Sequence, residues 1–194
     1  MGTQSGLNQI QNDSIISWNE ADGIINNRVR SIAEDNHGNL WIGTSDGMSV
    51  YDGTEFLNMT QFNGMSNDRI RCVTTDSFGN IWIGTFFGGI MRFNHDNFIS
   101  YTTSEGLVSN QILSINEDEK GDLLVGTYDG VSKLKMHNNK VIKAKTVGLE
   151  AGLKSKTVRC VFKDELNNYW YGTDRGVTII GPNGNYQLDR EKGL

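Results

Sequence analysis

Seven side chains are of types that could bind a sugar, and they lie in short segments that vary while the sequences around them repeat. They are Phe86, Phe87, Tyr128, Arg69, Arg28, Asp174 and Arg175. Aromatic rings stack on the CH surfaces of a sugar, and planar polar groups bond to its hydroxyl groups. The adjacent pair Phe86 and Phe87 is the most unusual, because one sheet face cannot bury two consecutive aromatic residues of a tight loop. The alternative is that one ring only fills the space between neighbouring sheets.

Residues for catalysis or metal binding are not grouped in this way. The histidines His37, His95 and His137 fall in three different turns, which favours solvated turn residues over a catalytic centre. The sequence has no nucleophile elbow, phosphate-binding loop or paired-carboxylate motif. It also has no histidine and cysteine cluster with the spacing of metal ligands. We therefore predict a protein that is not an enzyme and that binds neither a metal nor a cofactor.

Composition argues against two kinds of partner. The chain has 194 residues and a formal net charge of −5, which suits neither the phosphate backbone of nucleic acid nor an anionic membrane surface. Its longest apolar run has only a few residues, so no segment is expected to cross a bilayer. The first residues lack the basic and apolar parts of a secretion signal. This leaves either a cytoplasmic location or an export signal upstream of the chain.

A repeat of about forty residues organises the chain and must position the candidate residues. Glycine and an apolar residue begin each copy, at positions 23, 64, 106, 152 and 193. Each copy continues with an alternating run, an acidic turn and a segment similar to Trp-Ile-Gly-Thr. Short alternating runs between Gly, Asn and Asp clusters favour strands with tight turns. A period near forty with about four strand signals is typical of one blade of a β-propeller.

The first repeat shows where the strands are expected. They are strand A at 28–34, strand B at 40–44, strand C at 48–51 and strand D at 55–60. Between strands A and B, Asp35 can bond to the turn backbone and Gly38 can adopt a positive φ. In an up-and-down blade, the D–A and B–C loops lie on one face, which is the face that carries the seven candidate side chains.

These observations predict an all-β fold, namely a β-propeller fragment of four four-stranded antiparallel blades plus a leading half-blade. The expected parts are 1–22 (strands C and D of a partial blade), 23–63 (blade 1), 64–105 (blade 2), 106–151 (blade 3), 152–192 (blade 4) and 193–194 (the start of a truncated further repeat). The two ends do not complete one blade, and open sheet edges invite association. We therefore expect further propeller blades or a second chain to close the structure.

The segments Asp35–Gly47 and Asp76–Gly88 carry a family resemblance. Both follow the pattern Asp-x-x-Gly-Asn-x-Trp-Ile-Gly-Thr-x-x-Gly, which resembles the two-component regulator propeller repeat. The resemblance covers nearly the whole chain and weakens at Leu124, where Trp is expected, and at Asn167 and Asn168, where Gly and Asn are expected. It implies a periplasmic or extracytoplasmic sensor region of a hybrid two-component histidine kinase. Many such sensors respond to oligosaccharides.

Structural roles are expected for several other residues. The tryptophan position of strand B, held by Trp41, Trp82, Leu124 and Trp170, should pack between blades. The cysteines Cys72 and Cys160 fall two blades apart, so we expect free buried thiols rather than a disulfide. Arg30, Arg71 and Arg159 recur in strand A and could bind an anion. Pairing with nearby acids is the favoured alternative, because an unpaired charge is rarely buried.

The first functional hypothesis is a non-enzymatic ligand-sensing module of a two-component signalling protein. It would recognise a glycan or a partner domain on the face of the D–A and B–C loops. One alternative is a propeller lyase or hydrolase of the streptogramin-lyase type, and another is a pure protein-interaction scaffold. The expected partners are an oligosaccharide and further propeller blades or a second chain. Nucleic acid and membrane are not expected to contact this segment.

Overall fold

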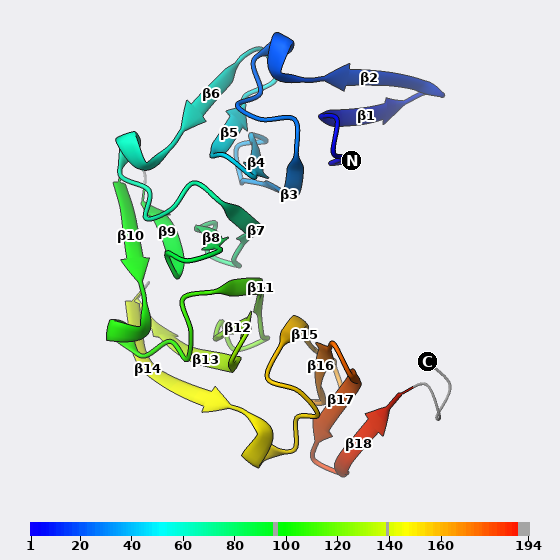
Figure 1. The fold of residues 1–194 in the computed structure, drawn as a ribbon, viewed down its shortest axis with the longest axis vertical. Helices are drawn as coiled ribbons and strands as arrows, with labels where there is room; N and C mark the ends of the chain where they lie inside the picture. Colours follow the sequence, from blue (N-terminus) through cyan, green and yellow to red (C-terminus); the bar gives the residue numbers. More distant parts are fainter. Residues whose placement is uncertain (95–96, 139, 190–194) are drawn as a thin grey trace. The chain divides into compact units, whose positions relative to one another are not determined.

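The computed structural model describes residues 1–94, 97–138 and 140–189 and consists of strands joined by short turns (Figure 1). The predicted all-β class is confirmed, since the strands form four four-stranded sheets and a leading two-stranded hairpin. The helices of this described part are 3-10 turns of three residues, and none is long enough to span a bilayer. His95, the last residues of the fourth expected blade and the expected further repeat at 193–194 lie outside the described residues.

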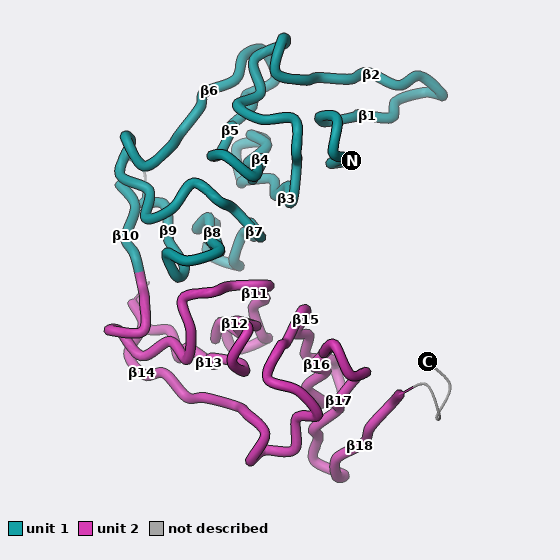
Figure 2. Tube along the Cα trace, in the orientation of Figure 1, with its two compact units in different colours: residues 1–100 teal, residues 101–194 magenta. Residues whose placement is uncertain are grey.

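The chain divides into two compact units, Met1–Ser100 and Tyr101–Leu194 (Figure 2). Unit 1 holds the hairpin β1 (Leu7–Gln11) and β2 (Ser14–Trp18), and a first sheet of β3 (Val29–Glu34), β4 (Leu40–Thr44), β5 (Met48–Tyr51) and β6 (Phe56–Met59). It also holds a second sheet of β7 (Ile70–Thr75), β8 (Ile81–Thr85), β9 (Ile90–Asn94) and all but the last residue of β10 (Asn97–Tyr101). Unit 2 holds a third sheet of β11 (Ile112–Glu117), β12 (Leu123–Thr127), β13 (Gly130–His137) and β14 (Lys140–Val147), and a fourth of β15 (Val158–Lys163), β16 (Tyr169–Thr173), β17 (Gly176–Gly181) and β18 (Gly184–Leu188).

Within each unit, the second strand of one sheet packs on the next sheet. In unit 1, Trp41 on β4 is 5% exposed and lies in one cluster with Ile70 and Ile83 of the second sheet. In unit 2, Leu124 on β12 lies in one cluster with Val158 and Tyr171 of the fourth sheet. These clusters bury apolar area that a single sheet could not bury alone, so sheet-on-sheet contact supplies the core of each unit.

Two of the three tryptophans at this strand position are buried. Trp41 and Trp82 are buried, as predicted. Trp170 on β16 is only half-buried, because the fourth sheet has no following sheet in the described chain. The prediction that both cysteines are buried is wrong for Cys160, which is exposed on β15, whereas Cys72 is partly buried. Neither Cys72 nor Cys160 forms a disulfide, as predicted.

An aspartate in the turn after the first strand of a sheet organises the repeat. Asp35 accepts hydrogen bonds from the amides of His37 and Asn39 and, at 3.0 Å, from Nε1 of Trp41. Burial alone would raise the pKa of Asp35, but the bonds from Trp41 and Asn39 outweigh it and lower the pKa. The indoles of Trp82 and Trp170 donate in the same way to the aspartates six residues before them, at 2.8 Å in each case. These bonds explain why the repeat spaces aspartate and tryptophan as it does.

A 3-10 turn precedes each four-stranded sheet, and the sequence analysis did not predict it. The four turns are η1 (Glu20–Asp22), η2 (Gln61–Asn63), η3 (Thr103–Glu105) and η4 (Leu149–Ala151). Each ends at the glycine that opens a repeat, and these glycines have φ between 94° and 111°. Asn19, Thr60 and Thr102 cap the first three turns with their side chains, whereas Gly148 offers no side chain to η4.

Candidate functional site

The basic and aromatic residues of unit 1 lie at one edge of its two sheets. The strands β3 and β7 begin at this edge, and their antiparallel neighbours β4 and β8 end there. The amide of Ser45 after β4 donates to the carbonyl oxygen of Arg28 at 3.2 Å, and the amide of Phe86 after β8 donates to that of Arg69 at 2.9 Å. The D–A and B–C loops therefore meet on one face of each sheet, as predicted.

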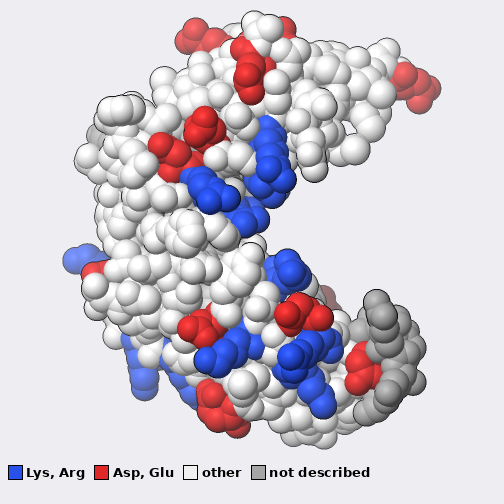
Figure 3. All heavy atoms as spheres, in the orientation of Figure 1, with Lys and Arg blue, Asp and Glu red and all other residues white. Residues whose placement is uncertain are grey.

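Four arginines come close together on this face. The pKa of Arg30 is lowered, first by burial and then by the charges of Arg28, Arg71 and Arg69. Figure 3 shows basic atoms gathered over β3 and β7 of unit 1. Arg30 donates from Nε to Oγ of Ser45 at 3.1 Å, and no described residue forms an ion pair with any of the four arginines. The expectation that acids pair with Arg30 and Arg71 is therefore wrong for the described part of the chain.

Phe86 lies against two of these guanidinium groups. The Cζ atoms of Arg69 and Arg71 are each 4.4 Å from the centroid of its ring, which places both charges over the aromatic face. The ring of Phe87 meets that of Phe86 edge-on, with centroids 4.3 Å apart, and Phe87 is 52% exposed. Phe86 thus supports the arginines, while Phe87 presents a ring to solvent. We call Arg28, Arg30, Arg69, Arg71, Phe86 and Phe87 the arginine–phenylalanine face.

The other three candidates belong to unit 2. The amide of Tyr128 donates to the carbonyl oxygen of Gln111 at 3.2 Å, which repeats the loop arrangement of unit 1. Asp174 and Arg175 are exposed between β16 and β17. The structure thus brings Arg28, Arg69, Phe86 and Phe87 together within unit 1. That all seven candidates line one surface stays a prediction.

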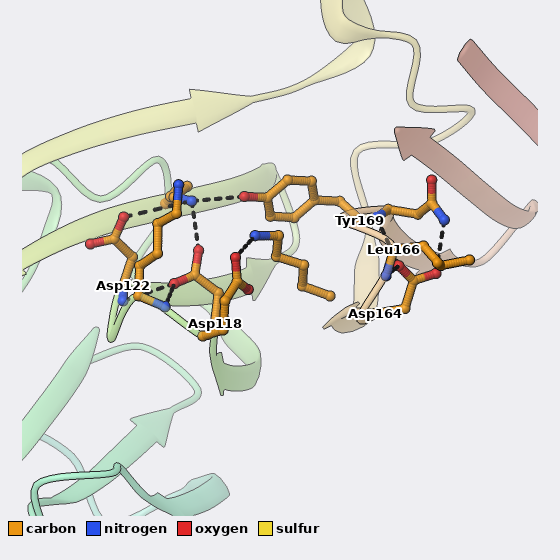
Figure 4. Close-up of polar contacts among 10 residues, drawn as sticks. Asp118, Asp122, Asp164, Leu166 and Tyr169 are labelled. Atoms are coloured by element: carbon orange, nitrogen blue, oxygen red, sulfur yellow. Dashed lines mark hydrogen bonds and ion pairs between the residues drawn. The ribbon is translucent and has the colours of Figure 1, made fainter. Parts of the chain in front are cut away.

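Unit 2 contains a polar network that the sequence analysis missed (Figure 4). Lys133 on β13 donates from Nζ to Oδ2 of Asp118 at 2.7 Å and to the hydroxyl oxygen of Tyr169 at 2.9 Å. A second carboxylate oxygen, on Asp122, lies 3.6 Å from Nζ. Burial by itself lowers the pKa of Lys133, but the bonds to Asp118 and Tyr169 outweigh it and raise the pKa. Lys163 and Glu119 form a neighbouring ion pair.

The positions of the metal-ligating and histidine side chains bear on whether these two sites could bind a metal or catalyse a reaction. Among residues 1–94, 97–138 and 140–189, no group of three or more His, Cys, Asp or Glu side chains could hold a metal ion. His37 follows β3 and His137 ends β13, so neither lies in the loops that carry the arginine–phenylalanine face. That face combines fixed positive charge with an exposed ring, which suits recognition of an anionic ligand.

Three segments of the chain, at residues 23–46, 64–87 and 106–129, match the family model of the two component regulator propeller. The chain carries two-component regulator propeller repeats. The matched segments run from the glycine that ends a 3-10 turn to the first loop residues after the second strand of the sheet. They therefore contain the aspartate and the strand position, tryptophan or Leu124, described above. No curated protein matches the sequence.

Solved structures share the fold of the two-component regulator propeller segment. The extracellular domain of a putative hybrid two-component system from B. thetaiotaomicron is 23% identical at a TM-score of 0.80, over 90% of this chain and 26% of that one. A second such domain from B. thetaiotaomicron is 22% identical at a TM-score of 0.77, over 97% and 29%. Virginiamycin B lyase from Staphylococcus aureus is 14% identical at a TM-score of 0.65, over 86% and 57%. The chain thus spans less than a third of the two extracellular domains.

Proposed function

We propose that this propeller segment is a non-enzymatic, ligand-sensing part of a two-component signalling protein and acts outside the cytoplasm. The family match and the likeness to extracellular domains of putative two-component systems support this proposal. The main observation behind it is the arginine–phenylalanine face, where four neighbouring arginines form no ion pair with a described residue and two of them lie over Phe86, next to the exposed ring of Phe87. These like charges repel one another, and an anionic ligand would relieve that repulsion.

The ligand that fits this face is an acidic glycan. Carboxylate or sulfate groups would accept hydrogen bonds from the guanidinium groups of Arg69 and Arg71, which match planar anions well. The exposed ring of Phe87 would stack on the CH surface of a sugar, as the sequence analysis expected. Binding at the edge shared by the first and second sheets would change how these sheets pack, and in a longer protein that change would bias the signalling output.

Calorimetric titration of the 194-residue chain with acidic and neutral oligosaccharides tests the proposal. Oligogalacturonate and chondroitin sulfate oligomers are the acidic probes, and maltohexaose is the neutral one. We expect binding of at least one acidic probe, weakened by salt, and about tenfold weaker binding by Phe87→Ala. The matched control is Phe78→Ala, since Phe78 is 70% exposed in the turn at the other end of β7.

Three results would contradict the proposal. Equal affinity of wild type and Phe87→Ala would remove the ring from the site. Equal affinity for maltohexaose and the acidic probes would remove the arginines. Binding of a protein domain in place of every oligosaccharide would favour the interaction scaffold. The lyase alternative has weaker support, because the similar lyase is only 14% identical and no described histidine lies in the loops of this face.

A further inference from the structure

A pocket of about 350 Å³ lies between the third and fourth sheets of unit 2. Its volume is at the small end of the range of roughly 300–1,000 Å³ that ligand sites occupy. Its walls come from β12, β13 and β14 on one side and from β16 and β17 on the other. The lining residues are Leu124, Val131, Lys133, Lys145, Thr146, Val147, Ala151, Tyr169, Tyr171 and Ile180. The pocket is therefore apolar with a few polar groups, and it shares no residue with the arginine–phenylalanine face.

Exchanges at repeat positions explain why this pocket exists. Leu124 stands where the first sheet has Trp41, and it is a smaller side chain facing the next sheet. The residue across from Leu124 on the neighbouring strand is Lys133, whereas Val50 lies across from Trp41. Lys133 also replaces the missing indole as the donor to the turn aspartate, here Asp118. Where the first sheet has a large aromatic ring, the third sheet therefore has the Lys133–Asp118 ion pair and an open pocket beside it.

The opposite wall brings hydroxyl groups into the same space. Tyr169 and Tyr171 on β16 occupy the positions that Leu40 and Ile42 hold on β4, and their rings are nearly parallel at 12° with centroids 6.3 Å apart. Tyr171 is only 3% exposed and lines the pocket, so its hydroxyl group can serve a ligand there as a hydrogen-bond donor.

The polar groups that remain available in the pocket are mainly donors. The Tyr169 hydroxyl oxygen already accepts from Lys133, so its hydrogen is left to donate. Lys133 itself is neutralised by Asp118, whereas Lys145, directly across from it on β14, is exposed and forms no ion pair with a described residue. A ligand for this pocket must accept hydrogen bonds, and its charge should balance that of Lys145.

We propose that this pocket binds a small carboxylic acid with an apolar body. The carboxylate accepts hydrogen bonds from the Tyr171 hydroxyl and from Nζ of Lys145 at the mouth. The apolar body packs on Leu124, Val131 and Ile180. A neutral sugar fits less well, because it brings no negative charge to balance that of Lys145 at the mouth. This proposal does not depend on the proposed function of the other face.

Titration of the full 194-residue chain with 4-phenylbutyrate, followed by calorimetry at neutral pH, tests the proposal. The neutral amide of the same acid is the matched probe. We expect saturable binding of the acid and at least tenfold weaker binding of the amide. The Tyr171→Phe variant removes only one oxygen atom and should weaken binding of the acid about tenfold. The Leu124→Trp variant should fill the pocket and abolish binding.

Thermal melting of each variant shows whether it is folded, and Tyr171→Phe alone decides the matter if Leu124→Trp does not fold. A control variant, Tyr186→Phe, alters a tyrosine that is 53% exposed on β18 and should leave the affinity unchanged. Failure of the acid to bind, equal binding of acid and amide, or full affinity in Tyr171→Phe would each overturn the proposal.

Discussion

The interface between sheets one and two and the interface between sheets three and four are built from the same repeat, yet they differ in what fills them. In unit 1, the indole of Trp41 donates to Asp35, and its ring meets that of Phe93 at 4.8 Å between centroids. In unit 2, Leu124 leaves the equivalent space partly open, and Lys133 supplies the donor to Asp118. The first interface is closed by an aromatic core, while the second combines a charged pair with a pocket.

This difference shows which part of the repeat is indispensable. The turn aspartate is kept in all four sheets, and it always receives a side-chain donor from the strand region beside it. The identity of that donor is free, because a buried carboxylate needs only a well-placed hydrogen bond. Replacing an indole with a lysine satisfies the same aspartate while releasing the volume of the ring. The repeat can thereby gain a binding pocket without losing its turn.

The largest effect should come from the aromatic interface. Trp41→Ala removes a side chain that is 5% exposed together with the hydrogen bond to Asp35, so the free energy of unfolding should fall by roughly 3–5 kcal/mol. Urea denaturation followed by circular dichroism measures it. The control is Trp170→Ala, whose half-buried ring should cost clearly less. Equal losses in the two variants would contradict the role given to the interface.

A smaller loss is expected at the charged interface. Lys133→Met keeps the aliphatic chain but leaves the carboxylate of Asp118, whose side chain is fully buried, without its cation. The free energy of unfolding should fall by about 2 kcal/mol. Adding Asp118→Asn to Lys133→Met removes the stranded charge and should recover part of this loss. If the double variant were less stable than the sum of the two single effects, the pairing would not be the source of the stability.

Acid sensitivity should distinguish wild type from Lys133→Met. Burial raises the pKa of Asp118, but the bond and charge of Lys133 together with the backbone amides of Lys120 and Asp122 outweigh it, and the pKa lies below its ordinary value. The carboxylate therefore adds stability above the unfolded-state pKa of about 3.9, and this is lost as the pH falls through the lower folded-state pKa. In Lys133→Met the loss should begin at a higher pH. Denaturation series between about pH 2 and pH 7 measure this loss. If the stabilities of wild type and Lys133→Met fell at the same pH, the prediction would be contradicted.

The smallest effect concerns the uncapped turn of unit 2. Gly148 has φ of −133° and ψ of −158°, close to the values of the capping residue Thr60, so a threonine fits its backbone. Gly148→Thr should stabilise the protein by roughly 0.5–1 kcal/mol through a new cap on η4. An added Cβ would lie 2.7 Å from Oε2 of Glu150, a flexible chain end that can move. Gly148→Ala is the control, and equal stability of the two variants would show that no cap forms.

The strands could be predicted from the sequence because local turn chemistry fixes them. The expected ranges 40–44 and 48–51 coincide with β4 and β5, since Asp35 and Gly38 define the turn before β4. The 3-10 turns also left a local signal, a capping residue followed four positions later by glycine, as in Thr60 and Gly64. Only the glycine of this signal entered the prediction, so the 3-10 turns were missed.

The sites were harder to predict because their contacts are not local. Phe86 could be recognised as unusual, but its position against Arg69 and Arg71 depends on the pairing of β7 with β8. Lys133 lies 15 residues from Asp118 and 36 from Tyr169, so no short motif joins them. A usable signal was the loss of tryptophan at Leu124, which the sequence analysis noted only as a departure from the family pattern.

The contrast between the two interfaces is tested most directly by methyl NMR of the 194-residue chain during titration with 4-phenylbutyrate. One spectrum reports both interfaces, since Leu124, Val131 and Ile180 line the pocket of unit 2, while Val50 and Ile83 lie in the aromatic core of unit 1. We predict saturable shifts for the methyl groups of the first set and unchanged positions for those of the second. Shifts in both sets, or in neither, would contradict the account.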